Sequence, residues 1–195
     1  MADKRVYFCF HYQDVSDFRV NVVRMHKVVG YESKSAGYLD ASIWEDAKKK
    51  GDLAIKRMIN SELEYTSVTA VLIGSDTYNR RWVRYEIIKS VQRSNRVIGV
   101  HINSIKDRFQ SIKAKGPDPF DFLALSISAD GSHATPMEHR NGTWGNYADL
   151  EGWTFDTTRP PSEWGKAHKL NYWLPVYDWL ADEGYTNFAK WIGAK

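Results

Sequence analysis

The residues with the clearest potential for chemistry lie between positions 74 and 86, directly after a short apolar run. Glu86 stands four positions after Trp82, so in a helix the two side chains share one face. A carboxylate half-shielded by an indole suits a reaction that develops positive charge on a sugar. A glutamate on an amphipathic helix also has an ordinary role, which is to pair with a neighbour such as Lys89 or Arg93. Spacing alone leaves both interpretations open.

Two turns contain the other polar candidates, and each turn follows an apolar run. The first comes after residues 5–10 and the second after residues 68–73. Their polar side chains include His11, Tyr12, Asp14, Ser75 and Asp76. The two aspartates and Ser75 are equally suited to helix capping, and His11 is equally suited to an ordinary turn. The six histidines and the single cysteine show no spacing typical of metal ligands.

Hydrophobic periodicity predicts the strands that position these turns. Residues 5–10, 68–73 and 96–102 are short apolar runs of the kind found in strands buried on both faces. Apolar residues at helical spacing over 82–94 place a helix between the last two of these strands. Strand, helix and strand with tight connections form a βαβ unit, which predicts an α/β fold with a parallel sheet.

The remaining elements carry weaker signals. Apolar periodicity predicts helices over 15–29 and 52–63. A second strand is expected near residues 37–41, within a poorly patterned loop at 33–50, and a fifth, edge strand at 122–128.

The expected sheet places the two polar turns side by side. We predict a flavodoxin-like open parallel sheet with strand order 2-1-3-4-5, flanked by helices. Ligands of such sheets bind beyond the carboxyl ends of the strands, where the strand order reverses. The reversal then lies between the strands that end at Phe10 and Ile73, so the two turns flank one crevice. The helix starts beyond these turns offer backbone N–H donors that suit phosphate.

Composition favours one main globular domain. The 195 residues are 43% hydrophobic and 26% charged, so a core can form. A formal charge of +3 is too small to predict a nucleic-acid groove, although it suits a small anionic ligand. The sequence shows no signal-peptide pattern and no apolar stretch of membrane-spanning length, which favours a cytoplasmic protein without a membrane partner. Cys9 lies in an apolar run and is expected to be an inert buried thiol.

Tryptophan is concentrated in the last third of the chain. Five of the eight tryptophans fall between Trp144 and Trp179. Residues 129–165 are rich in Gly, Pro, Thr, Asn and Trp, a composition that predicts an ordered, irregular excursion. We therefore expect one domain at 1–128 and a Trp-rich C-terminal extension at 129–195 that packs on the same domain.

With these features in view, the sequence resembles Toll/interleukin-1 receptor (TIR) domains of the bacterial TIR-like branch. The matching segments, within residues 4–128, are RVYFCFHYQD, SVTAVLIGSDTYNRRWVRYEIIKS and RVIGVHI. The W-x-x-x-E spacing of Trp82 and Glu86 matches the position of the catalytic glutamate in TIR domains that cleave NAD. The whole chain, with its Trp-rich tail, resembles the TIR proteins of Thoeris anti-phage systems.

The resemblance implies an enzyme of the NAD+ glycohydrolase or ADP-ribosyl cyclase type, with NAD+ as substrate and no metal or separate cofactor. The product would be a cyclic ADP-ribose isomer, a diffusible second messenger that activates a separate NAD-depleting effector. Carried over by position, Glu86 becomes the catalytic residue. The substrate-binding candidates are Phe10, His11, Tyr12, Asp14, Ser75 and Trp82. The resemblance also implies a phage-derived trigger and a homo-oligomer.

Two other functions fit the same sequence. One is a non-catalytic TIR-like scaffold for protein–protein interaction, and the other is a glycosylase that uses the same carboxylate on another nucleoside. The chain also departs from the family pattern at two places. His11 stands where many TIR domains have serine, and residues 33–50 do not match the loop that often completes a neighbour's active site. The resemblance therefore does not extend to these two places.

Overall fold

A parallel sheet of four strands forms the centre of the protein. The structure, a computed structural model, describes residues 5–11, 13–26 and 41–194. The strand order of this sheet is β1-β2-β3-β9. Its strands are β1 (Val6–Phe10), β2 (Val68–Ile73), β3 (Arg96–His101) and β9 (Val176–Asp178). All six residues of β2 are buried, as expected for a strand covered on both faces.

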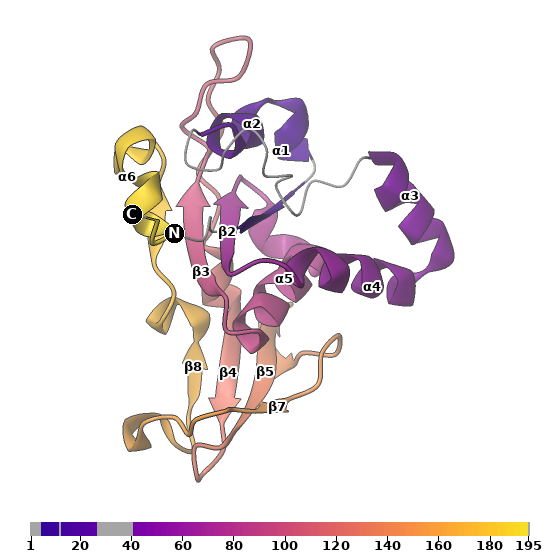
Figure 1. The fold of residues 1–195 in the computed structure, drawn as a ribbon, viewed down its shortest axis with the longest axis vertical. Coiled ribbons are helices and arrows are strands. Elements are labelled where there is room, and N and C mark those ends of the chain that lie inside the picture. Colours follow the sequence, from indigo (N-terminus) through magenta and orange to yellow (C-terminus); the bar gives the residue numbers. More distant parts are fainter. Residues whose placement is uncertain (1–4, 12, 27–40, 195) are drawn as a thin grey trace.

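Helices cover both faces of this sheet (Figure 1). On one face lie α4 (Asp52–Leu63) and α5 (Arg81–Gln92), with α3 (Ala41–Lys50) packed against α4. On the other face lie α2 (Arg19–Arg24) and α6 (Gly184–Trp191). Among the helices in the described ranges, none combines the length and the apolar character needed to cross a bilayer.

Side-chain alternation along β1 divides the core in two. Tyr7 and Cys9 point to the face covered by α4 and α5, whereas Val6 and Phe8 point to the face covered by α2 and α6. All four side chains are 3% exposed or less. The short helix α1 (Gln13–Ser16) joins β1 to α2.

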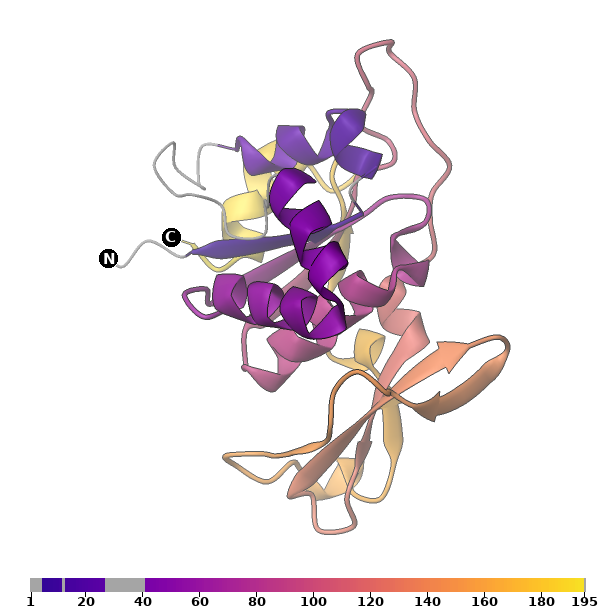
Figure 2. The same cartoon turned by 90° about the vertical axis from the view of Figure 1, so that its right-hand side faces the viewer.

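A second, antiparallel sheet lies below the parallel one, as Figures 1 and 2 show from two sides. Its order is β6-β5-β4-β8, with β7 paired to β5. The strands are β4 (Leu123–Ile127), β5 (His133–Arg140), β6 (Thr143–Asn146), β7 (Trp153–Thr154) and β8 (Ala167–Lys169). Short 3₁₀ helices complete the described elements: η2 (Thr77–Asn79), η3 (Pro119–Phe122), η4 (Pro161–Glu163) and η5 (Leu170–Tyr172).

A buried arginine fastens α5 to the antiparallel sheet. The side chain of Arg84 is 3% exposed, and its Nη1 lies 2.7 Å from Oε2 of Glu138 on β5. The same nitrogen donates to the carbonyl of His139 at 3.0 Å, and Nε donates to the carbonyl of Tyr78 at 3.0 Å. Helix α5 therefore touches both sheets.

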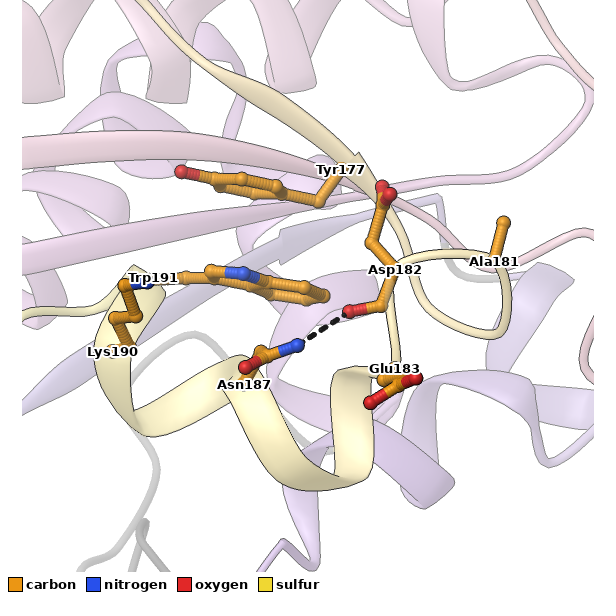
Figure 3. A pocket seen from close by; sticks show the side chains of 7 residues that line it. All are labelled: Tyr177, Ala181, Asp182, Glu183, Asn187, Lys190 and Trp191. Carbon is orange, nitrogen blue, oxygen red and sulfur yellow. Dashed lines mark hydrogen bonds between the residues drawn. The ribbon is translucent and has the colours of Figure 1, made fainter.

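The last helix closes the edge of the parallel sheet beside β9. The ring of Trp191 on α6 stacks on Tyr177 of β9, with ring centroids 4.3 Å apart and an angle of 1° between the planes. Together with Asp182, Glu183 and Lys190, these rings line an open groove of about 420 Å³ (Figure 3).

The α/β fold class and the parallel arrangement of the three main predicted strands are confirmed. The prediction that residues 122–128 form the fifth strand of this sheet is wrong, because β4 is an inner strand of the antiparallel sheet. The place beside β3 is taken by β9, whose register pairs Gly99 with Val176. A strand of three half-buried residues leaves little periodicity for sequence analysis to detect.

The prediction of an irregular excursion at 129–165 is also wrong, since this segment contributes β5, β6 and β7. Pro136 lies inside β5, and a proline argues against a strand when only the sequence is known. The division at residue 128 stays a prediction, although β4 pairs with strands beyond that position and β9 pairs with β3.

The first half of the chain differs from its prediction in three places. The helix expected over 15–29 is divided into α1 and α2 at Phe18, which has a φ of 64°; residues 27–29 lie outside the described residues. Most of the strand expected at 37–41 also lies outside them, and Ala41 begins α3, which replaces the predicted loop up to Lys50. The capping roles are wrong as well. Helix α5 begins after Arg80 without a side-chain cap, and Asp14 lies inside α1.

The tryptophan content of the last third gives a test of this fold. Trp179 is fully buried and makes edge-to-face ring contacts with Phe188 at 5.6 Å and Tyr185 at 5.1 Å. Trp179→Ala is expected to lower the free energy of unfolding by about 3–5 kcal/mol, because it leaves a large cavity. Trp144, on β6, is 40% exposed, so Trp144→Ala is the control and should cost less than about 1 kcal/mol. Urea unfolding followed by circular dichroism measures both, and equal losses would contradict the placement of Trp179.

Candidate active site

Helix α5 presents Glu86 to β1. The apolar residues Val83, Ile87 and Ile88 of this helix are buried in the core on the same face of the sheet as Tyr7 and Cys9. Glu86 lies between these apolar positions and is partly buried. The predicted helix is therefore confirmed, and Glu86 lies on the edge of its buried face.

Two donors from β1 hold the Glu86 carboxylate. The Tyr7 hydroxyl donates to Oε1 of Glu86 at 2.7 Å. The Cys9 thiol donates to the other oxygen, Oε2, with a distance of 2.8 Å between sulfur and oxygen. Tyr7 and Cys9 are two positions apart on a strand, so they share one face and both reach the same carboxylate.

Burial dominates the electrostatics of this group. It raises the pKa of Glu86 from 4.5 to about 7, while the hydrogen bonds from Cys9 and Tyr7 act in the opposite direction. Burial, followed by the charge of Glu86, raises the pKa of the Tyr7 phenol and of the Cys9 thiol well above their ordinary values. Both groups are consequently protonated donors at neutral pH. The carboxyl group therefore ionises near neutral pH, and such perturbed pKa values are frequent at active sites.

Trp82 packs on the same helix, one turn before Glu86. Its ring makes an edge-to-face contact with Tyr85 at 6.1 Å, and the guanidinium of Arg81 lies 4.6 Å from the ring centroid. Arg81 in turn forms a bidentate pair with Asp149, with distances of 2.8 and 2.6 Å. Trp82 is partly buried and packs against the core. Together with the pair between Arg81 and Asp149, this packing holds the start of α5 in place.

The two predicted turns lie side by side. β1 and β2 are neighbours in the sheet, and Asp14 is 3% exposed beside the turn that follows β2. A Cβ atom placed at Gly74 would collide with the Asp14 carboxylate, so any larger residue there would require Asp14 to move. The turns therefore meet in direct contact at this point. Burial raises the pKa of Asp14, and the neighbouring Lys113 opposes that rise.

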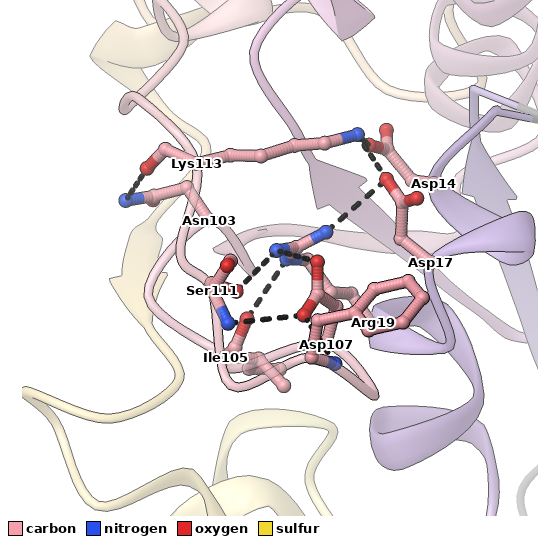
Figure 4. Close-up of polar contacts among 9 residues, drawn as sticks. Asp14, Asp17, Arg19, Asn103, Ile105, Asp107, Ser111 and Lys113 are labelled. Carbon is pink, nitrogen blue, oxygen red and sulfur yellow. Dashed lines mark hydrogen bonds and ion pairs between the residues drawn. The ribbon is translucent and has the colours of Figure 1, made fainter.

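The loop after β3 joins the same edge of the sheet (Figure 4). Arg19 of α2 is 1% exposed and donates from Nε to the carbonyl of Ile105 at 2.8 Å and from Nη2 to the carbonyl of Ser111 at 2.6 Å. Lys113 of this loop pairs with Asp14 at 3.6 Å and also with Asp17. The segments that follow β1, β2 and β3 thus form one connected polar edge.

The other predicted site residues are spread around this edge. His11 is partly buried, and its pKa is lowered by burial and by the nearby Arg80. Ser75 is exposed. Phe10 packs with the core on the opposite face of the sheet from Glu86. Tyr12 lies outside the described residues. The structure therefore brings His11, Asp14 and Ser75 to neighbouring turns.

Sequence analysis missed Tyr7 and Cys9 as parts of the site. Cys9 was expected to be an inert buried thiol; it is buried and free, but it is also a hydrogen-bond partner of Glu86. The available signal was two side chains with polar atoms at alternate positions of an otherwise apolar strand.

Two hollows elsewhere on the protein are lined by other residues than Tyr7, Cys9 and Glu86. The groove beside α6 lies on the sheet face opposite Glu86. A second hollow of about 290 Å³ lies between the end of α5 and the antiparallel sheet, lined by Trp153, Phe155, Arg159 and Trp173 among others. Within the described part of the chain, no group of three or more His, Cys, Asp or Glu side chains is arranged to hold a metal ion.

The family follows from comparison with known proteins. The family model described as Thoeris protein ThsB, TIR-like domain, matches residues 7–107, which span β1 to the loop after β3 and include Glu86. The chain belongs to the ThsB family of TIR-like proteins. A protein of Bacillus cereus (strain MSX-D12), described as a cyclic ADP-D-ribose synthase, ThsB1, is 53% identical over 189 residues, covering 97% of this chain and 98% of the relative. The likeness to ThsB proteins thus extends through the antiparallel sheet and α6.

The raised pKa of Glu86 predicts how stability depends on pH. A carboxyl whose pKa rises on folding, here from 4.5 to about 7, binds its proton more tightly in the folded state. Its favourable contribution is complete below the unfolded value and is lost as the pH rises through about 7. Relative to Glu86→Gln, the free energy of unfolding of the unmodified protein should fall by about 2 kcal/mol between about pH 4 and pH 8. This is less than the full pKa shift would give, because Glu86 is partly exposed and solvent screens its charge. Urea unfolding at each pH measures this, and a difference independent of pH would contradict it.

Proposed function

We propose that this ThsB-family protein cleaves NAD+ and joins the released ADP-ribose part into a cyclic ADP-ribose isomer. The observation that carries the proposal is the Glu86 carboxylate on α5 of a TIR-like domain, with each oxygen bound to a donor of β1. The description of the relative with 53% identity as a cyclic ADP-D-ribose synthase supports the same activity.

The first step separates nicotinamide from the ribose. The bond between ribose C1′ and the nicotinamide nitrogen breaks, and its electron pair leaves with nicotinamide. Because nicotinamide departs neutral from a cationic precursor, the step needs no general acid. Positive charge develops on the ribose, and a fixed carboxylate next to the ring stabilises it. We assign this role to Glu86, together with binding of the ribose hydroxyls.

The second step closes the ring. An atom of the adenosine half bonds to the same ribose carbon, and one proton is released overall. Water competes for that carbon and would give linear ADP-ribose, so cyclisation requires the adenosine half to be held close while water is kept away. We propose that His11, Asp14, Ser75 and Trp82 contact the nucleotide, together with Phe10 and Tyr12, which flank His11 in the sequence.

The product is proposed to act as a diffusible second messenger in anti-phage defence. Membership of the Thoeris ThsB family supports this setting. The messenger would activate a separate effector that depletes NAD, and a phage-derived component would trigger its synthesis. We also propose that the protein acts in the cytoplasm and as a homo-oligomer, with NAD+ as a substrate and no additional cofactor.

Replacement of the carboxylate tests the activity. Glu86→Gln keeps the shape of the side chain but removes its charge, so nicotinamide release and cyclic product should fall at least about 100-fold. The assay incubates each purified protein with NAD+, with and without lysate of phage-infected cells, and follows both products by mass spectrometry.

Glu151→Gln is the matched control, because Glu151 is exposed and lies outside the site. It should retain full activity. Normal product formation by a folded Glu86→Gln variant would overturn the role of Glu86. A folded unmodified protein that releases no nicotinamide under either condition would favour the scaffold function.

A further inference from the structure

We propose that Tyr7 and Cys9 are positioning residues that fix the orientation of the Glu86 carboxylate and help to keep it charged for the ribose of NAD+. The proposal rests on the proposed function and adds two residues to it. Neither residue needs to touch the substrate, since each acts through Glu86.

The two contacts fix the carboxylate because they reach different oxygens. The Tyr7 hydroxyl binds Oε1 at 2.7 Å, and the Cys9 thiol binds Oε2 at 2.8 Å. The terminal torsion of a glutamate side chain is otherwise broad, so a single contact would leave the group free to turn. The donors themselves are held firmly, since Tyr7 is 1% exposed and Cys9 is 0% exposed in a strand paired along its length with β2.

A third contact fixes the backbone of the same residue. Thr69 of β2 donates to the Ser90 hydroxyl at 2.8 Å, and Ser90 donates to the carbonyl of Glu86 at 2.7 Å. Thr69 is the register partner of Tyr7 in the parallel sheet. Glu86 is therefore held to neighbouring positions of β1 and β2 by both its side chain and its main chain, as a preorganised site requires.

The remaining acceptor capacity suits a diol. An ionised carboxylate offers about four lone-pair sites, and Tyr7 and Cys9 use one on each oxygen. Each oxygen therefore keeps acceptor capacity for a further hydroxyl. The two adjacent hydroxyls of a ribose can bind the two oxygens of one carboxylate held in this orientation.

The same contacts favour the charged form. Burial raises the pKa of Glu86, and the donors from Cys9 and Tyr7 lower it. Removal of either donor therefore raises the pKa further and reduces the charged fraction near pH 7. The titratable groups around this carboxylate are Tyr7 and Cys9 on β1, with Glu62 of α4 acting on Tyr7.

Three variants test the proposal by removing or replacing one donor. Tyr7→Phe removes only the hydroxyl, Cys9→Ala removes the thiol, and Cys9→Ser restores a donor at the same position. Tyr85→Phe is the matched control, because it removes a hydroxyl of α5 that donates to Asn60 at 3.1 Å instead of to Glu86. All are measured in the full-length chain for kcat, for KM of NAD+ and for the pH dependence of kcat/KM.

In the unmodified protein kcat/KM, which reports ionisation of the free enzyme, should rise with pH through about 7 as Glu86 ionises. Tyr7→Phe and Cys9→Ala should lower kcat roughly tenfold at pH 7, with KM changed less than about twofold, because the carboxylate is less charged and less well aligned. The acidic limb of the pH profile should move up by about one pH unit. Cys9→Ser should recover most of the loss and return the limb toward its original position, whereas Tyr85→Phe should leave both unchanged.

A direct titration separates failure of this proposal from failure of the proposed function. The carboxyl ¹³C signal of Glu86, identified by its absence in Glu86→Gln, reports its pKa whether or not NAD+ is cleaved. A higher pKa in Tyr7→Phe and Cys9→Ala supports the proposal. An unchanged pKa of Glu86 in these variants overturns the proposal, even if kcat falls. A Tyr7→Phe variant with the same kcat as the unmodified protein also overturns it. If the unmodified protein shows the titration but never releases nicotinamide, the proposed function fails, and with it the catalytic purpose of the two residues.

Discussion

Helix α5 carries a buried arginine, Arg84, and a partly buried glutamate, Glu86, and the two sheets supply their hydrogen-bond partners. Glu86 is held by Tyr7 and Cys9 of β1, while Arg84 pairs with Glu138 of β5. An isolated buried charge costs several kcal/mol, so Arg84 depends on its partners, whereas Glu86 without its donors would take up a proton more readily. The helix that presents the carboxylate is therefore bonded to both the parallel and the antiparallel sheet.

The last third of the chain contributes aromatic side chains to the cores on both faces of the parallel sheet. Trp179, Phe188 and Trp191 complete the core on the face covered by α2 and α6. Trp153 and Trp173 pack against the other core, which contains Tyr7, Cys9 and α5. The unusual number of aromatic residues is thus explained by two separate surfaces that each need covering. The two donors of the carboxylate, Tyr7 and Cys9, lie in the second of these cores.

The sequence predicted those strands and helices that have a clear apolar periodicity of their own. The βαβ unit around α5 and the neighbouring position of β1 and β2 were predictable, because apolar periodicity marks buried strands and helices. β9 was missed because three half-buried residues carry almost no pattern, and β5 because Pro136 interrupts its reading as a strand. The family resemblance singled out Glu86. Its donor Tyr7 is 79 positions away in the sequence, and a contact over that distance has no local signature.

The pairing of β9 with β3 affects the order in which the chain folds during synthesis. Translation proceeds from the N-terminus, so β3 leaves the ribosome well before its partner, with the whole antiparallel sheet encoded between them. Until Val176–Asp178 emerges, one edge of β3 offers unpaired backbone groups, which are a template for association with other chains. Addition of β9 is therefore a late step in the assembly of the central sheet, and a chain that stops before β9 keeps an open edge on the sheet that supports Glu86.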